Sequence, residues 1–371
     1  MKLKIVLINI LIFILLLLIA DLFFSKFVFK QSVDHKCYEH TDNGKFYKMR
    51  KNCFANMRII SSIDSFKVYT DEDGNRFSGK KREKKDNSIV FLGDSQTFGI
   101  GSNWEDAFIG VIEKKIPNYN YYNLGVPSYS PTVYKYALKQ FINSKKVKIK
   151  KVYVLIDLTD VADESNRWRE INGKPRLEEK KIIYKERSKF SKFKKENFKG
   201  IYLMSSNIRS FLRKIKNKKK KSKKNEYRPV DGNPTGSYIY TDHKTLTGCH
   251  EKEQKNEFWK CGDIELGIKK IKIRINELSK IVQSLNSEFY IIIMPWPDTL
   301  NFGQTVFNWE NYAKELCLET KCTKLINLFP EFKDIKNENE EWLKTIYLHN
   351  DIHLTKKGNS LLAEKLISES F

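Results

Sequence analysis

The fold is decided by residues 89–99, which read IVFLGDSQTFG. The opening residues form an apolar run of the kind that a central strand of a parallel sheet needs. Gly93 permits a sharp exit from that strand, and Asp94 and Ser95 follow where a helix would begin. A serine in this position is exposed at the carboxyl end of a sheet, where open α/β folds carry their chemistry. Taken alone, the stretch leaves two interpretations open: Asp94 and Ser95 are turn and N-cap residues, or Ser95 is a nucleophile.

A second informative stretch lies near the end of the sequence, at residues 350–359, NDIHLTKKGN. It places Asp351 just before His353, and the apolar spacing of Leu361–Ile367 predicts a helix behind them. A serine nucleophile is weak until a base takes its proton, and a carboxylate best orients that base. A loop Asp and His with only local hydrogen bonds is the alternative. The presence of Ser95 in the same chain favours catalysis.

Together these two blocks resemble the SGNH, or GDSL-type, hydrolase superfamily. The resemblance covers residues 88 to about 160 and residues 289–366. It implies an α/β protein with a three-layer α/β/α, flavodoxin-like fold and a parallel sheet. It also implies that Ser95 is the nucleophile, that His353 is the general base, and that Asp351 orients this base.

The oxyanion hole of the family maps onto two further blocks. The block NLGVPS at residues 123–128 matches a family glycine, so the resemblance makes the backbone N–H groups of Gly125 and Ser95 oxyanion donors. Such donors typically stabilise the tetrahedral intermediate by several kcal/mol. The third block departs from the family pattern Gly-x-Asn-Asp. After a predicted strand at residues 152–156 the sequence reads Asp-Leu-Thr-Asp, so Thr159 stands at the Asn position with a hydroxyl group in place of an amide.

The acid of the triad has one alternative. Many hydrolases of the family have Asp-x-x-His, a spacing that would place Asn350 at the acid position. The Asp-x-His spacing is more similar to periplasmic relatives that modify polysaccharides by acyl transfer. Asp351 is the better assignment, because an asparagine has no full charge with which to stabilise an imidazolium.

Three further side chains are candidates for binding substrate. Asp94 and Asp160 stand beside the motif residues. Trp296 follows the predicted strand Phe289–Met294, and residues after the carboxyl end of a strand line the site in this architecture. A tryptophan that only covers the core is an equal alternative for Trp296.

The N-terminus predicts an export signal. Lys2 and Lys4 precede an uncharged run, Ile5–Ala20, which Asp21 interrupts before Leu22–Phe24 resumes it. Such a run is close to the roughly 20 residues that span a bilayer, and the lysines should stay cytoplasmic. No small-x-small cleavage site follows, so we expect an uncleaved anchor in a bacterial inner membrane with the remaining chain in the periplasm. A cleaved signal peptide is the alternative.

The cysteines agree with an exported chain. There are six cysteines, an even number, and they fall into close pairs in the sequence. These pairs are Cys37 with Cys53, Cys249 with Cys261, and Cys317 with Cys322. In an oxidising compartment this spacing suggests local disulfides, although sequence alone does not fix the pairing. No Cys-x-x-Cys or His-x-x-x-His spacing supports a zinc site, and we expect no metal and no cofactor.

The formal net charge of +23 is concentrated in one segment. Residues 180–228 carry much of the excess, including the run Lys218–Lys221. The lysines do not alternate with a platform of stacking aromatics, so the pattern does not favour nucleic acid. A solvated surface loop is the first interpretation, and attraction to anionic lipid headgroups or an acidic glycan is the functional alternative. Residues 200–215 have helical apolar spacing, typical of a helix that lies on a membrane or docks on the core.

These features divide the chain into an anchor at residues 1–30, a membrane-proximal segment at residues 31–87, and an SGNH-like domain at residues 88–371. The domain contains a basic insertion at about residues 166–262. A long amphipathic helix is predicted at residues 264–285, ahead of the strand at residues 289–294. Strands that alternate with helices predict a parallel sheet covered on both faces.

The resemblance therefore implies an enzyme that acts on ester bonds through an acyl-Ser95 intermediate. Water would make it an esterase, most plausibly a deacetylase of a cell-surface polysaccharide. A sugar hydroxyl would make it an O-acyltransferase, supplied with acyl groups by a membrane-bound partner. A noncatalytic glycan-binding or assembly subunit with the same fold is the alternative from another class.

Overall fold

A computed structural model of the chain describes residues 2–28, 32–33, 37–58, 65–83, 85–178, 193, 197–202, 204–205, 208, 212, 263–304, 307–348 and 351–371. Most of the predicted basic insertion lies outside these residues. So do Asn350, the alternative acid, and the Cys249–Cys261 pair.

A nine-stranded sheet forms the centre of the domain, in the order β1-β4-β5-β6-β8-β7-β9-β12-β13. Within this order, the neighbouring strands β8, β7, β9, β12 and β13 pair in parallel. Numbered along the chain, these parallel strands lie in the order 2-1-3-4-5, which is the flavodoxin-like order. The predicted fold class is therefore confirmed by the strand order itself. The bounds are β7 (Asn87–Leu92), β8 (Asn120–Asn123), β9 (Lys148–Leu155), β12 (Glu288–Ile293) and β13 (Lys324–Asn327).

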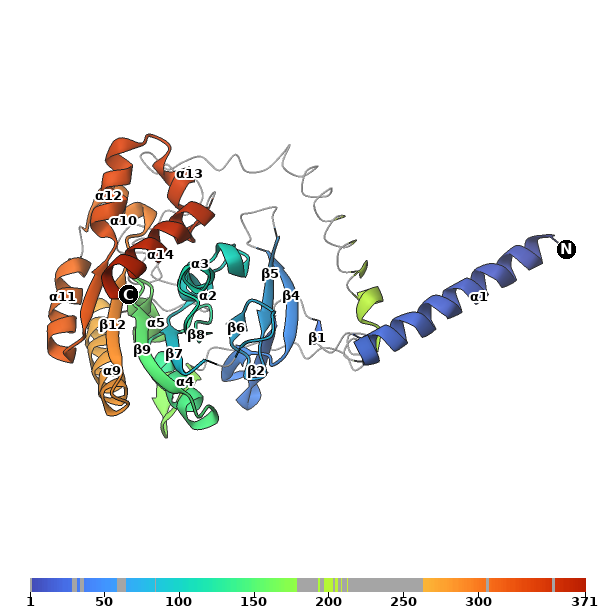
Figure 1. The fold of residues 1–371 in the computed structure, drawn as a ribbon, viewed down its shortest axis with the longest axis horizontal. Helices are drawn as coiled ribbons and strands as arrows, with labels where there is room; N and C mark the ends of the chain where they lie inside the picture. Colours follow the sequence, from blue (N-terminus) through green and yellow to red (C-terminus); the bar gives the residue numbers. More distant parts are fainter. Residues whose placement is uncertain are drawn as a thin grey trace.

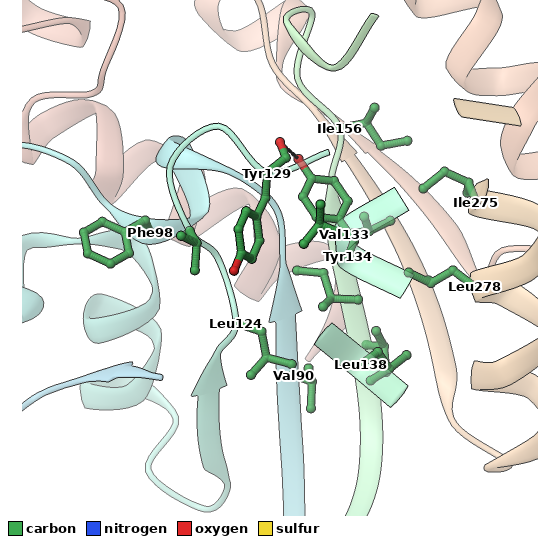
Figure 2. Packing of buried hydrophobic residues seen from close by; sticks show 14 of the residues in the cluster. Val90, Phe98, Leu124, Tyr129, Val133, Tyr134, Leu138, Ile156, Ile275 and Leu278 are labelled. Carbon is green, nitrogen blue, oxygen red and sulfur yellow. Dashed lines mark hydrogen bonds between the residues drawn. The ribbon is translucent and has the colours of Figure 1, made fainter. Parts of the chain in front are cut away.

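Helices cover both faces of the parallel strands (Figure 1). Alternate residues of β7 enter two separate cores: Ile89 and Phe91 belong to one, Val90 and Leu92 to the other. Figure 2 shows Val90 in the second core, together with side chains of the helices that pack there. The first core receives α3 (Phe108–Lys115), α12 (Phe329–Glu338), α13 (Trp342–Ile346) and α14 (Lys356–Ser370). The second receives α4 (Pro131–Ser144), α9 (Ile264–Ser284) and α11 (Trp309–Thr320).

The membrane-proximal segment extends this sheet. In this segment β4 pairs antiparallel with β5, and β5 pairs antiparallel with β6. Strand β6 then pairs antiparallel with β8 through Arg76 and Asn123. The boundary at residue 88 therefore does not separate two packing units. A disulfide between Cys37 and Cys53 fastens the start of this segment to β4. The bounds are β1 (Ser32–Val33), β4 (Cys53–Arg58), β5 (Ser65–Thr70) and β6 (Arg76–Phe77).

Two small antiparallel sheets lie beside the main one. They are β2 (Tyr38–Thr41) with β3 (Phe46–Met49), and β10 (Trp168–Ile171) with β11 (Lys174–Leu177). The hairpin β10–β11 opens the predicted insertion. Leu177 donates its backbone N–H to the carbonyl of Lys45, so the start of the insertion is tied to the membrane-proximal segment.

An N-terminal helix, α1 (Lys2–Phe23), leads away from the domain (Figure 1). Among the described residues it is the one helix long and apolar enough to cross a membrane, with a candidate span from Lys4 to Phe27. None of its apolar window is buried in the protein. The second described disulfide joins Cys317 and Cys322 at the end of α11, as the spacing predicted.

Candidate active site

Ser95 lies at the first position of α2 (Ser95–Phe98), directly after β7. Gly93 makes the exit from the strand with a φ of 157°, and a Cβ there would collide with the Thr97 side chain. Asp94 is the N-cap, because one of its carboxylate oxygens accepts the Gln96 N–H at 3.0 Å. Its other oxygen accepts the Ser95 hydroxyl at 3.0 Å. The predicted N-cap role of Asp94 is therefore correct, and it coexists with a half-buried, accessible serine.

His353 and Asp351 form a close pair in the loop before α14. The distance from His353 Nδ1 to Asp351 Oδ1 is 2.5 Å. The same carboxylate oxygen accepts the backbone N–H groups of Ile352 at 2.8 Å and of His353 at 3.1 Å. A proton on Nδ1 leaves Nε2 as an acceptor, which is the tautomer that a general base needs. Nε2 is buried and has no hydrogen-bond partner among the residues that the structure describes.

The fold brings this loop to the serine across most of the domain. Gln96, which follows the serine, donates its side-chain N–H to the carbonyl of Ile352 at 3.0 Å, over a separation of 256 residues. The pKa of Asp94 also indicates that the His353 loop lies close to Ser95. Burial raises this pKa, and the charge of His353 opposes that rise. Ser95 and His353 therefore both interact with Asp94. The carboxyl ends of β7 and β9 lie at the point where the strand order reverses, the usual position for a site in this topology.

The predicted oxyanion donors have partners within the protein. The Gly125 N–H donates to the side-chain oxygen of Asn123 at 2.9 Å. Thr159 donates both its N–H, at 2.8 Å, and its hydroxyl, at 2.7 Å, to one oxygen of Asp157. Substrate would have to displace these bonds, and the oxyanion roles of Ser95, Gly125 and Thr159 stay predictions.

The three candidate substrate-binding residues, Asp94, Asp160 and Trp296, are all buried. Trp296 is 1 % exposed and Asp160 is fully buried. Trp296 donates its indole N–H to Asp157 at 3.0 Å, and Asp160 accepts the hydroxyl of Tyr134 at 2.8 Å. Asp94, also buried, holds Ser95. All three side chains are therefore enclosed by the protein, and their substrate-binding roles stay predictions.

The surroundings of Asp94 are rich in carboxyl groups. Burial, and then the charge of Asp94, raises the pKa of Asp157 to about 7. Burial also raises the pKa of Asp160 well above its ordinary value, with the charges of Asp94 and Asp157 adding to it. Three carboxyl groups therefore compete for ionisation near Ser95.

Comparison with known families gives one match. Residues 1–247 match the family described as "Protein of unknown function (DUF1574)". The chain belongs to this family. The match on this DUF1574 chain includes Ser95, Gly125 and Thr159, and it ends before Asp351 and His353. No curated protein matches the sequence.

Solved structures similar to this DUF1574 chain include enzymes of the type that its motifs resemble. A member of the lipolytic G-D-S-L family from Veillonella parvula has 10 % identity and a TM-score of 0.40, and the alignment covers 76 % of this chain and 98 % of that one. Axe2, an acetylxylan esterase from Geobacillus stearothermophilus, has 11 % identity and a TM-score of 0.38, with 78 % and 96 % covered. A lipase/acylhydrolase from Enterococcus faecalis has 10 % identity and a TM-score of 0.39, with 76 % and 94 % covered. At these scores the likeness assigns no activity, and the chemistry depends on the residues of this chain.

Proposed function

We propose that this protein is a serine hydrolase that acts on ester bonds. The observation that carries the proposal is the His353–Asp351 pair, whose Nε2 is buried without a partner among the described residues and whose loop is bonded to Gln96, the neighbour of Ser95. A histidine that serves only structure would have a partner on that nitrogen, because an unsatisfied buried polar atom costs about 1–3 kcal/mol. The proposed role of Nε2, which is to accept the proton of Ser95 during the reaction, accounts for that cost.

The reaction follows from the placement of these groups. Ser95 Oγ attacks the ester carbonyl carbon while its proton passes to His353 Nε2, and Asp351 stabilises the imidazolium that forms. The tetrahedral intermediate collapses, the ester C–O bond breaks, and Nε2 returns the proton to the leaving alkoxide. Water then attacks the acyl-Ser95 ester with the same histidine as base, which releases a carboxylic acid and restores the serine.

We place this chemistry outside the cytoplasm of a bacterium, on the O-acetyl groups of a cell-surface polysaccharide. The apolar helix α1 supports a single-pass anchor in the inner membrane, and the disulfides support an oxidising compartment. The acceptor distinguishes two versions of the proposal. A sugar hydroxyl in place of water would make the protein an O-acyltransferase that depends on a membrane-bound acyl donor.

The test uses the full-length chain in detergent, incubated with p-nitrophenyl acetate and examined by intact mass. Ser95→Ala should lower the turnover by about a thousandfold, because the nucleophile and the base act as a unit. Ser368→Ala is the matched control, since Ser368 is an exposed serine on α14. Fast turnover without an adduct supports an esterase, and a persistent acetyl adduct on Ser95 supports a transferase. Turnover or adduct that is equal in wild type and Ser95→Ala would contradict the proposal and favour a glycan-binding subunit.

A further inference from the structure

Asp21 interrupts the apolar run of the anchor, and the structure gives it a partner. Its carboxylate accepts the backbone N–H of Gly200 at 2.8 Å and that of Ile201 at 2.9 Å. Ser25, one turn further along, accepts the N–H of Lys199 at 2.8 Å. Backbone N–H groups at the start of a helix lack partners within that helix, and a carboxylate there is also favoured by the helix dipole. The end of the anchor therefore caps a helical segment of the insertion.

The contact is close and specific. A Cβ on Gly200 would lie 2.6 Å from Asp21 Oδ1, so a larger residue would require the Asp21 carboxylate to shift. Figure 1 shows the described helical part of the insertion, coloured yellow-green, beside the end of α1. Asp21, the charged residue within an apolar helix, is therefore hydrogen-bonded to the insertion.

The capped segment carries an exposed apolar stripe. Its described residues at positions 199–202, 204, 205, 208 and 212 are helical. Met204, Ile208 and Leu212, spaced one helical turn apart, are 62 %, 49 % and 56 % exposed. Residues at this spacing lie on one face of a helix. The exposure matches that of the anchor itself, where Leu11 is 69 % exposed.

The length of the anchor sets the height of this stripe. At about 1.5 Å per residue, the rise from Lys4 to Asp21 is roughly 26 Å. The hydrocarbon core of a bilayer is about 30 Å thick, so Asp21 lies about 4 Å, less than one helical turn, inside the outer boundary of the apolar layer. A helix whose first turn binds Asp21 therefore begins at the bilayer surface. In the sequence the stripe is followed by Lys218–Lys221, a charge pattern suited to anionic headgroups.

We infer that the described helical residues 199–202, 204, 205, 208 and 212 lie on the outer surface of the phospholipid bilayer, with Met204, Ile208 and Leu212 inserted among the lipids and Asp21 as the fixed point. This inference rests on the proposed anchoring of the chain by α1. A helix with an apolar face and a basic neighbour binds such an interface. Two attachments, one spanning and one lying flat, restrict rotation of the domain about its single anchor and hold Ser95 at a set orientation to the membrane.

The test is photo-crosslinking of the full chain in bacterial membranes. The photoreactive residue p-benzoylphenylalanine replaces Leu212, Leu11 or Leu318 in separate samples, and adducts are identified by mass. Leu318 is the matched control, because it is a 79 % exposed leucine on α11. We expect phospholipid adducts at Leu11 and at Leu212, with the yield at Leu212 about tenfold above that at Leu318. Asp21→Ala should lower the yield at Leu212 about threefold and leave Leu11 unchanged.

The other outcomes overturn the inference in distinguishable ways. Lipid adducts at Leu11 with only the Leu318 yield at Leu212 would leave the anchor intact and refute the surface helix. A protein adduct at Leu212 would show that a protein partner covers the stripe. No lipid adduct at either Leu11 or Leu212 would refute the anchor as well. A yield at Leu212 unaffected by Asp21→Ala would refute the role of Asp21 as the fixed point.

Discussion

Replacing Arg76 by methionine should destabilise α2, the helix that carries Ser95, the proposed nucleophile. Arg76 is 1 % exposed and lies on β6, far from Ser95 in the sequence. Its guanidinium donates to the carbonyls of Phe98, of Gly99 at 2.7 Å and of Ser102 at 2.5 Å. These carbonyls terminate α2 and the turn after it, where a cation is also favoured by the helix dipole. Methionine fills similar volume but donates to none of them.

The magnitude follows from the carbonyls that lose their donor. The Gly99 carbonyl keeps the Ser102 N–H at 3.3 Å, so two carbonyls are left without one. A buried acceptor without a donor costs about 1–3 kcal/mol, so Arg76→Met should lower the free energy of unfolding by about 2–6 kcal/mol. The measurement is urea unfolding of the full chain in mild detergent, followed by tryptophan fluorescence. Arg169→Met, at a 58 % exposed arginine side chain, is the control and should change it by less than about 0.5 kcal/mol.

The assay has a second readout at the serine. A fluorophosphonate probe should label Ser95 more slowly in Arg76→Met under conditions where the variant remains folded, because the end of α2 is no longer held. Arg76→Lys keeps a charge but not the planar fork of donors, and it should recover only part of the stability. A loss below about 1 kcal/mol for Arg76→Met, with normal labelling, would refute the reasoning.

Three further predictions concern other parts of the domain. Gln96→Ala removes the bond to the Ile352 carbonyl and should lower kcat about tenfold with KM little changed, measured with p-nitrophenyl acetate; an unchanged kcat would show that the base loop is held without it. Burial raises the pKa of Asp157 from its ordinary 3.8 to about 7, so the folded chain keeps a proton that the unfolded chain loses, and stability falls as pH rises through this window. Asp157→Asn should flatten that slope in a series of melting curves, and an unaltered slope would assign it to other groups. Replacing Cys37 and Cys53 together by serine opens a loop with a sequence separation of 16 and should cost about 3 kcal/mol in urea unfolding, whereas an equal unfolding midpoint would contradict this.

The parallel half of the fold was predictable because its strands are buried on both faces. Such strands appear in the sequence as continuous apolar runs, so β7 and β12 were found to within a residue or two of their bounds. The amphipathic helix at residues 264–285 was equally clear and is α9 (Ile264–Ser284). The local disulfides Cys37–Cys53 and Cys317–Cys322 followed from proximity in the sequence.

Long-range pairings of single residues were not predictable. The contact of Gln96 with the carbonyl of Ile352 joins residues 256 apart and has no spacing signal. Thr159 stood at a family position, but its bond to Asp157 depends on a local turn and not on the family pattern. Trp296 had two equal interpretations, and only packing could select the buried one. The adjacency of Gln96 to Ser95 is the one signal that pointed to a missed site residue.

The antiparallel strands β4, β5 and β6 lie in the chain between α1 and β7, the strand that leads to Ser95. The disulfide at Cys53 fixes β4, β6 pairs with β8 through Arg76, and Arg76 holds the end of the helix that begins at Ser95. A motif search would start the catalytic domain at residue 88, because nothing earlier resembles the hydrolase blocks. A fragment cut there loses Arg76 and exposes the edge of β8, and an exposed strand edge promotes aggregation. A soluble, active fragment should therefore begin before β1, near residue 31. The segment between α1 and the serine motif therefore belongs to the same folding unit as the proposed active site, because it supplies part of the sheet and the cation that terminates α2.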